Sequence, residues 1–192
     1  FIDKTFAGHN KKFNEVTWFY VSTDNTAGTN NPEPDSYVTF NYSDGSWTIG
    51  TLDRNVWSDS LGFRKVPFAF DSTGELYNHE TGTTDDGSAM SCFVETSDLE
   101  VSESGERLFM IDKIVPDATM TADTSLFVEL KTRKYPQDTE ITKGPFTITP
   151  TTGKVSTRAR GRQVAVKFSS TGTTDDWQLG DFRINTRDDS FR

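Results

Sequence analysis

The sequence predicts an all-β protein, and three observations support this fold class. Aromatic residues make up 12% of the 192 residues, and Thr, Ser, Asp and Gly are abundant among the rest, a mixture that favours strands and turns over helices. Apolar and polar residues alternate over short runs that end at Gly, Pro, Asn or Asp, as in strands buried on one face. No run keeps a helical period for more than about two turns. We therefore expect many short strands joined by turns.

The first half of the chain contains two patterns that predict β-hairpins. The runs 37–42 and 47–52 flank Ser-Asp-Gly-Ser, and Asp-Gly between alternating runs is a strong hairpin signal. The runs 66–70 and 75–79 flank the turn Asp-Ser-Thr-Gly. Successive hairpins of short aromatic strands are typical of β-propeller blades. This half therefore predicts β-propeller blade fragments, about one and a half blades.

Two further segments precede these hairpins. Residues 16–21 read Val-Thr-Trp-Phe-Tyr-Val, a nearly continuous apolar run that predicts a central strand buried on both faces. Residues 22–35 are rich in Thr, Asn, Gly and Pro, which predicts a long loop.

A change in composition divides the chain. Residues 90–101 predict one or two strands, and the acidic segment 102–106 follows them. We place the domain boundary there, which gives partial propeller blades at 1–105 and a second domain at 106–192. The second domain is expected to be a small antiparallel β-sandwich or platform, with strands at 107–115, 125–133, 145–149, 155–168 and 177–185.

The longest of these runs changes its alternation part of the way along. Small and apolar residues occupy odd-numbered positions from Val155 to Ala159 and even-numbered positions from Val164 to Phe168. One extra residue in a bulge at Gly161 would keep both halves on the same core, because a bulge re-phases a strand. The next run changes phase in the same way at Gly180. The two shifts together predict a strongly curved antiparallel sheet.

The order of motifs at the C-terminal end resembles the tail nozzle proteins of short-tailed phages, especially marine and cyanobacterial ones. These proteins are also called tail tubular protein B or packaged-DNA stabilisation proteins. The motifs are RARGRQ at 158–163, an apolar alternation, a polar turn, W-x-L-G-x-x-R-I at 177–184 and an Arg/Asp-rich terminus. Further segments that resemble the family are 18–20, 37–42, 47–52, 76–80 and 143–146.

The resemblance covers most of the chain and implies a non-enzymatic structural protein of the virion, located in the phage tail. It implies a homohexameric ring below the head-to-tail adaptor, with tail fibre proteins as further partners. The propeller parts would face outward around a channel through which double-stranded DNA passes without sequence-specific binding. The match is to the C-terminal part of such proteins, and a start at Phe1 rather than Met also suggests a longer polypeptide.

Charge is distributed unevenly along the chain. The net charge is −9, but residues 1–130 hold 8 Lys/Arg against 22 Asp/Glu, whereas residues 131–192 hold 12 against 7. An acidic body disfavours non-specific DNA binding and fits a conduit whose wall does not adhere to DNA. In the basic part, Arg158, Arg160 and Arg162 are candidate subunit contacts, because guanidinium groups pair with carboxylates in a fixed orientation. The alternative is an arginine row on a solvated face.

The sequence offers little for catalysis, and we expect no enzyme and no cofactor. Its two histidines, His9 and His79, do not have the spacing of metal ligands. Serine-nucleophile motifs and phosphate-binding glycine loops are absent from the sequence. Cys92 is expected to be a small core residue. No apolar run approaches the roughly 18 residues that span a bilayer, so this segment is not expected to insert into a membrane.

The hexapeptide TGTTDD occurs twice, at 81–86 and 171–176. We interpret it as turn chemistry that arose twice rather than as a structural repeat. Paired aspartates in such turns also bind Ca²⁺ in some proteins, which leaves open an ion at Asp85 and Asp86 or at Asp175 and Asp176. Our prediction is that no metal is bound.

A carbohydrate-binding module of a phage tail or receptor-binding protein is the alternative function. Exposed aromatic rings on a β-rich scaffold can stack on sugars. Trp18, Trp47 and Trp177 lie inside apolar alternations and are expected to be buried. Trp57 lies in Arg-Asn-Val-Trp-Ser-Asp and is expected to be exposed on a loop. Trp57 is therefore the candidate exposed aromatic contact.

Overall fold

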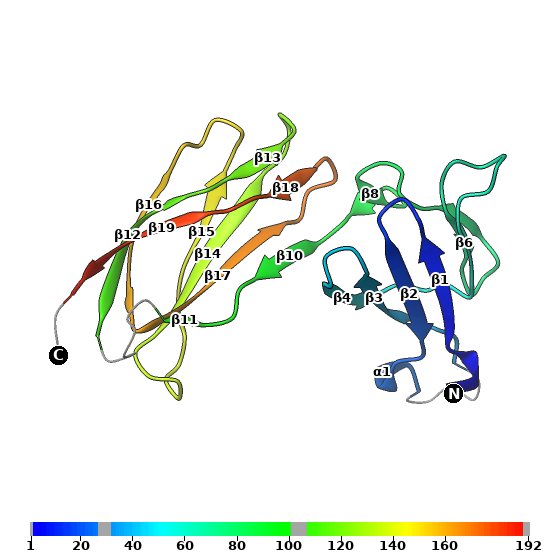
Figure 1. Cartoon of the computed structure of the whole chain (residues 1–192), viewed down its shortest axis with the longest axis horizontal. Coiled ribbons are helices and arrows are strands. Elements are labelled where there is room, and N and C mark those ends of the chain that lie inside the picture. Colours follow the sequence, from blue (N-terminus) through cyan, green and yellow to red (C-terminus); the bar gives the residue numbers. More distant parts are fainter. Residues whose placement is uncertain (1, 27–31, 101–106, 190–192) are drawn as a thin grey trace. The chain divides into compact units, whose positions relative to one another are not determined.

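The computed structural model of the chain describes residues 2–26, 32–100 and 107–189. Strands make up 53% of it and helices 3%, in several antiparallel sheets, and none of the sheets in these ranges is closed. This confirms the predicted all-β class. The chain divides into two compact units, Phe1–Gly82 and Thr83–Arg192, and each is described by itself below (Figure 1).

The first unit contains a four-stranded antiparallel meander in the order β1-β2-β3-β4. A 3-10 turn at Ile2–Lys4 precedes it, and the single-turn helix α1 (Thr23–Thr26) lies in the predicted loop. The β3–β4 pairing confirms the first predicted hairpin, whose turn contains Gly45 with a φ of 78°. The strands are β1 (Phe6–Asn10), β2 (Glu15–Tyr20), β3 (Ser36–Asn41) and β4 (Trp47–Thr51).

A three-stranded antiparallel sheet completes the first unit, in the order β5-β6-β7. Its β6–β7 pairing confirms the second predicted hairpin. In that turn Gly74 has a φ of 88°, and Asp71 accepts a hydrogen bond from the Thr73 backbone at 2.9 Å. The strands are β5 (Val56–Ser58), β6 (Phe68–Phe70) and β7 (Leu76–Asn78).

The two sheets of the first unit pack against each other through Trp57. Its ring centroid lies 5.6 Å from that of Phe19, and its indole N–H donates to the His9 carbonyl at 3.1 Å. A Cβ placed on Gly8 would lie 2.5 Å from the Trp57 ring. Glycine at position 8 therefore lets the tryptophan lie directly on β1. Phe19 and Ala69 are almost completely buried at this contact.

The second unit begins with a short hairpin of β8 and β9, and the strands that follow form two antiparallel layers. One layer has the order β10-β17-β14-β15, with β11 also paired to β17, and the other has the order β16-β12-β19. A separate antiparallel pair is formed by β13, which follows β12 in the chain, and β18, which precedes β19. The elements of the hairpin and the first layer are β8 (Thr84–Asp85), β9 (Ser88–Ala89), β10 (Cys92–Glu95), β11 (Leu99–Glu100), β14 (Leu126–Arg133), β15 (Ile141–Ile148) and β17 (Gln163–Ser170). The others are β12 (Phe109–Val115), β13 (Ala118–Met120), β16 (Val155–Gly161), β18 (Trp177–Leu179) and β19 (Arg183–Asp188).

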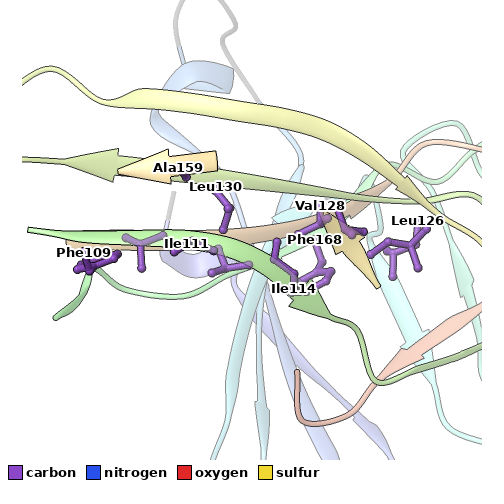
Figure 2. Packing of buried hydrophobic residues seen from close by; sticks show 12 residues of the cluster. Phe109, Ile111, Ile114, Leu126, Val128, Leu130, Ala159 and Phe168 are labelled. Carbon is purple, nitrogen blue, oxygen red and sulfur yellow. The ribbon is translucent and has the colours of Figure 1, made fainter. Parts of the chain in front are cut away.

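The core of the second unit lies between these two layers (Figure 2). Strand β14 shows strict alternation, with Leu126, Val128 and Leu130 fully buried. Phe168 on β17 is 1% exposed and lies 5.1 Å from the Phe182 ring. The remaining buried members of the cluster are Phe109, Ile111, Ile114, Ile148, Val155, Ala159, Val164 and Val166.

The boundary between the units lies earlier than the sequence suggests. The predicted boundary at residues 102–106 lies outside the described residues. The strands before it, β10 and β11, already pair with β17 of the second unit. The structure therefore divides the chain between Gly82 and Thr83 rather than between residues 105 and 106. Composition did not reveal this, because hydrogen-bond partners that are distant in sequence determine the division.

The predicted bulge at Gly161 is corrected by the structure. Residues on its two sides belong to different layers, β16 pairing with β12 and β17 pairing with β14. A Cβ on Gly161 would lie 2.9 Å from the carbonyl oxygen of Arg133, so a glycine is needed where the chain crosses between layers. The change in alternation keeps both strands facing one core, but through a change of sheet rather than through one curved strand.

Candidate interaction surfaces

The outward side of the meander is apolar and uncovered among the described residues. Register places its side chains in two rows, Val16 beside Phe40 and Trp47, and Trp18 beside Val38 and Ile49. Trp47 is 61% exposed and Ile49 is 79% exposed. The rings of Phe40 and Trp47 are 4.6 Å apart, and those of Trp18 and Trp47 are 6.1 Å apart. We call these six residues the aromatic face: Val16, Trp18, Val38, Phe40, Trp47 and Ile49.

The three-stranded sheet of the same unit also carries an apolar row on its outward side. Val56, Phe70 and Leu76 are paired in register, and all three are exposed. The inward row is Trp57, Ala69 and Tyr77. A two-layer sandwich ordinarily has polar outer faces. Here each sheet is apolar on both sides, and exposed apolar patches of this kind are typical of interaction surfaces.

The structure reverses the expectations for two tryptophans. Trp57 is not free on a loop, because it belongs to β5, is half-buried and lies 4.7 Å from the His79 ring. Trp47, which was expected to be buried, is exposed, whereas Trp18 and Trp177 are half-buried. Alternation correctly placed Trp47 on an apolar face, but it does not reveal whether that face is covered.

The three candidate arginines do not form one row. Arg158 and Arg160 are exposed on the outward side of β16. Arg160 pairs with the carboxylate of Asp189, whereas Arg158 has no ion pair within the described part of the chain. Arg162 lies at the crossing between layers, half-buried, with its guanidinium 4.6 Å from the centroid of the Tyr135 ring. Only Arg158 and Arg160 are thus placed for a shared contact, and Arg162 has a local structural contact.

A small polar cluster lies at one end of the meander. Asn10 is directly paired with Glu15 across β1 and β2, and its side-chain nitrogen donates to Glu80 at 3.0 Å. Burial raises the pKa of Glu80 above its usual value. Burial also raises the pKa of Glu15, and the negative charges of Glu80 and Asp44 raise it further. The ionised form of Glu15 is therefore disfavoured in the folded protein.

We predict that Glu15→Gln stabilises the first unit at pH 7. A carboxyl whose folded pKa is raised contributes stability that is fully present below its unfolded pKa and is lost as pH rises through the folded pKa. Glutamine mimics the protonated form, so the substitution should raise the free energy of unfolding at pH 7. This gain in stability should disappear near pH 4. Because Glu15 is partly exposed, we expect less than about 1 kcal/mol. Urea unfolding at the two pH values measures this difference.

Asp71→Asn provides the control of opposite sign. Although desolvation opposes it, hydrogen bonds from the Glu75 backbone and from Thr73 hold the pKa of Asp71 below its usual value. Asp71 therefore contributes stability above its unfolded pKa, and Asp71→Asn should lower stability at pH 7. A loss of stability on Glu15→Gln at pH 7 would contradict the prediction.

The two histidines take part in local hydrogen-bond networks. His79 Nε2 lies 3.0 Å from the Arg54 Nε that donates to it. His9 lies 3.3 Å from the Tyr42 hydroxyl and 3.7 Å from Asp59, with 40% of its side chain exposed. An exposed histidine between a phenol and a carboxylate is a polar surface contact, and catalysis would need a nucleophile or an oxyanion site beside it. That the chain is not an enzyme stays a prediction.

The two TGTTDD segments adopt different turns. Asp86 and Gly87 both have positive φ, 46° and 82°, which makes the β8–β9 turn a two-residue hairpin turn. In the second copy, the Asp175 carboxylate accepts from the backbone of Gly172 at 2.6 Å and of Ser125 at 3.0 Å. Different conformations favour recurrent turn chemistry over a structural repeat. Within the described ranges, no group of three or more His, Cys, Asp or Glu is arranged to hold a metal ion.

Cys92 is exposed rather than part of the core. Its thiol lies 3.2 Å from the Ser170 hydroxyl, which in turn accepts from the Trp177 indole at 2.9 Å. The short run Met-Ser-Cys-Phe-Val lacks strict alternation, and this strand lies at an edge of its sheet, so an apolar residue there need not face the core.

Comparisons with known proteins do not identify a family for this chain. No family model matches the sequence. No curated protein matches it either. Among the residues that the structure describes, none of the helices has the length and apolar character required to cross a bilayer.

Proposed function

We propose that this chain is part of a ring-forming virion structural protein, the nozzle of a short phage tail. In this proposal the first unit consists of partial propeller blades and the second unit is a β-sandwich. Six copies form a ring below the head-to-tail adaptor, with tail fibre proteins nearby, and the ring conducts and retains packaged double-stranded DNA. The sequence resemblance indicates the kind of assembly. The aromatic face is the single observation in the structure that supports assembly with other subunits.

The packing of the first unit supports the propeller part of the proposal. Its two sheets meet through Trp57 and Phe19, yet each also has an apolar outer side. Sheets that are apolar on both sides are expected where layers stack repeatedly around an axis, since every layer then has two neighbours. Exposed rings such as Trp47 are too costly to leave in water over a whole sheet face. A further β-layer on the aromatic face would complete the stack.

The charge distribution is compatible with a conduit. The chain has a net charge of −9, and a passing polyanion does not adhere to a like-charged wall. We infer that DNA passes without adhering, and that contacts between subunits supply the strength of the ring.

The assembly should depend on the aromatic face. We predict that Ile49→Asp weakens association by at least about tenfold, because burying an unpaired carboxylate costs several kcal/mol. The native mass of the chain would be measured by sedimentation over a concentration series, with and without the head-to-tail adaptor. A sixfold assembly that the substitution disrupts is the expected result.

Phe63→Asp is the matched control for this experiment. Phe63 is 81% exposed, like Ile49 at 79%, but it lies outside the aromatic face. The control should assemble as the unaltered chain does. A chain that stays monomeric with adaptor present would overturn the ring. Glycan binding by that monomer, lost on Trp47→Ala, would instead support the carbohydrate-binding module, for which the exposed Trp47 ring is the specific observation.

A further inference from the structure

The outward side of the layer β16-β12-β19 carries a cluster of basic side chains. Arg160 is directly paired with Met110, which is paired with Arg187 on the other side. Arg158 lies two residues before Arg160 on the same side, about 7 Å away along the strand. All the basic residues of this side are exposed. We call them the cationic face: Lys113, Arg158, Arg160, Arg183 and Arg187.

Two of these arginines already bind carboxylates of their own chain. Arg187 lies 2.8 Å from Asp112, and Arg160 pairs with Asp189. A hydrogen bond from Asn185, together with Arg187 and Lys113, lowers the pKa of Asp112. Arg158 and Arg183 make no ion pair or side-chain hydrogen bond with the described residues. The face therefore accepts carboxylates, and the guanidinium groups of Arg158 and Arg183 have no ion pair among the described residues.

The chemistry of the face favours an acidic protein surface over nucleic acid. Its apolar members among the described residues are Met110 and Val115, so this part of the face offers no aromatic ring on which a base could stack. The second unit as a whole is acidic, with 14 Lys/Arg against 18 Asp/Glu over residues 83–192, which opposes the approach of DNA. Carboxylates are the groups already paired with this face, and the guanidinium fork suits them.

The same unit carries an acidic hairpin that fits such a face. Asp85 and Asp86 lie at the tip of the β8–β9 hairpin, and both are exposed. Neither makes an ion pair with the described residues. The Thr83 hydroxyl donates to the Thr173 carbonyl at 2.8 Å, which attaches the hairpin to the loop before β18. Two carboxylates are thus presented on a short and well-defined turn.

We propose that the cationic face binds the acidic hairpin, Asp85 and Asp86, of a second copy of this chain. The contact is head to tail, because two different surfaces of one unit meet, and repetition of such a contact closes a ring when the rotation per subunit permits. This inference rests on the proposed ring and names one of its subunit contacts. It replaces Arg162 in the expected contact set with Lys113, Arg183 and Arg187.

Charge reversal on each side tests the contact. Arg158→Glu with Arg183→Glu alters the two arginines that have no ion pair with the described residues, so the fold should be retained. Asp85→Lys with Asp86→Asn reverses the hairpin, and asparagine tolerates the left-handed backbone at position 86. Each double variant should weaken self-association by about tenfold or more, judged by sedimentation. The variant that carries all four substitutions should regain association, because its charges are again complementary.

Lys143→Glu with Lys154→Glu is the control, since it changes the charge by the same amount at exposed positions outside the face. Normal association of the face variant would overturn this contact and leave the ring intact. A wild-type chain that never associates, with adaptor present, would overturn the ring and this contact together. Binding of a duplex DNA fragment that is lost only in the face variant, with association unchanged, would replace the protein partner with DNA.

Discussion

Phe168→Ala should lower the free energy of unfolding of the second unit by about 3–5 kcal/mol. The side chain is 1% exposed, lies in the core between the two layers and contacts the Phe182 ring at 5.1 Å. Its removal loses the transfer free energy of the ring and leaves a cavity that the strands around it cannot fill, because β17 is paired on both sides. Urea unfolding followed by circular dichroism measures the loss.

Phe93→Ala is the matched control on the neighbouring strand. Phe93 is 66% exposed, and the Lys167 ammonium lies 5.0 Å from the centroid of its ring. Truncation there should cost less than about 1 kcal/mol. Equal losses at the two positions would mean that the core does not lie where the register of β17 places it.

Trp57→Ala should destabilise the first unit by about 3 kcal/mol, at the lower end of the range for large aromatic residues because the ring is half-buried. The substitution removes the contact with Phe19 at 5.6 Å and the hydrogen bond to the His9 carbonyl. It also leaves the space above Gly8 empty. The expected signature is an unfolding transition of the first unit at a lower urea concentration, followed by the fluorescence of the remaining tryptophans.

Trp47→Ala separates stability from assembly. Trp47 is 61% exposed in the single chain, so its removal should cost the isolated chain less than about 1 kcal/mol while weakening association through the aromatic face. If Trp47→Ala destabilises the single chain more than Trp57→Ala does, the assignment of inner and outer sides of the meander is wrong.

Much of the fold follows from local sequence patterns. The turn signals around Gly45 and Gly74 predict both hairpins of the first unit, because the residues that define such a turn are adjacent in the chain. The division near Gly82 could not be predicted in this way. It depends on β10 and β11 pairing with β17, and no local pattern specifies a partner that far along the chain.

The candidate surfaces were only partly predictable for a related reason. Alternation correctly places Arg158 and Arg160 on one side of a strand, and it identifies the apolar side that contains Trp47. It cannot show that β19 brings Arg183 and Arg187 beside them, nor that the meander has its aromatic side uncovered while Trp57 covers the other. Those facts depend on which sheets pack together.

The strand order of the second unit also determines when that unit can fold. Cys92 contacts Ser170 across 78 residues, and β12 finds one of its partners in β19 at the end of the unit. Contacts between distant parts of a chain slow folding, because a long loop must close before any pairing is gained. On the ribosome, β10 must wait for β17, and β12 must wait for β19, which are both synthesised much later. The meander β1–β4 pairs only successive strands, so it can form while the second unit is still emerging.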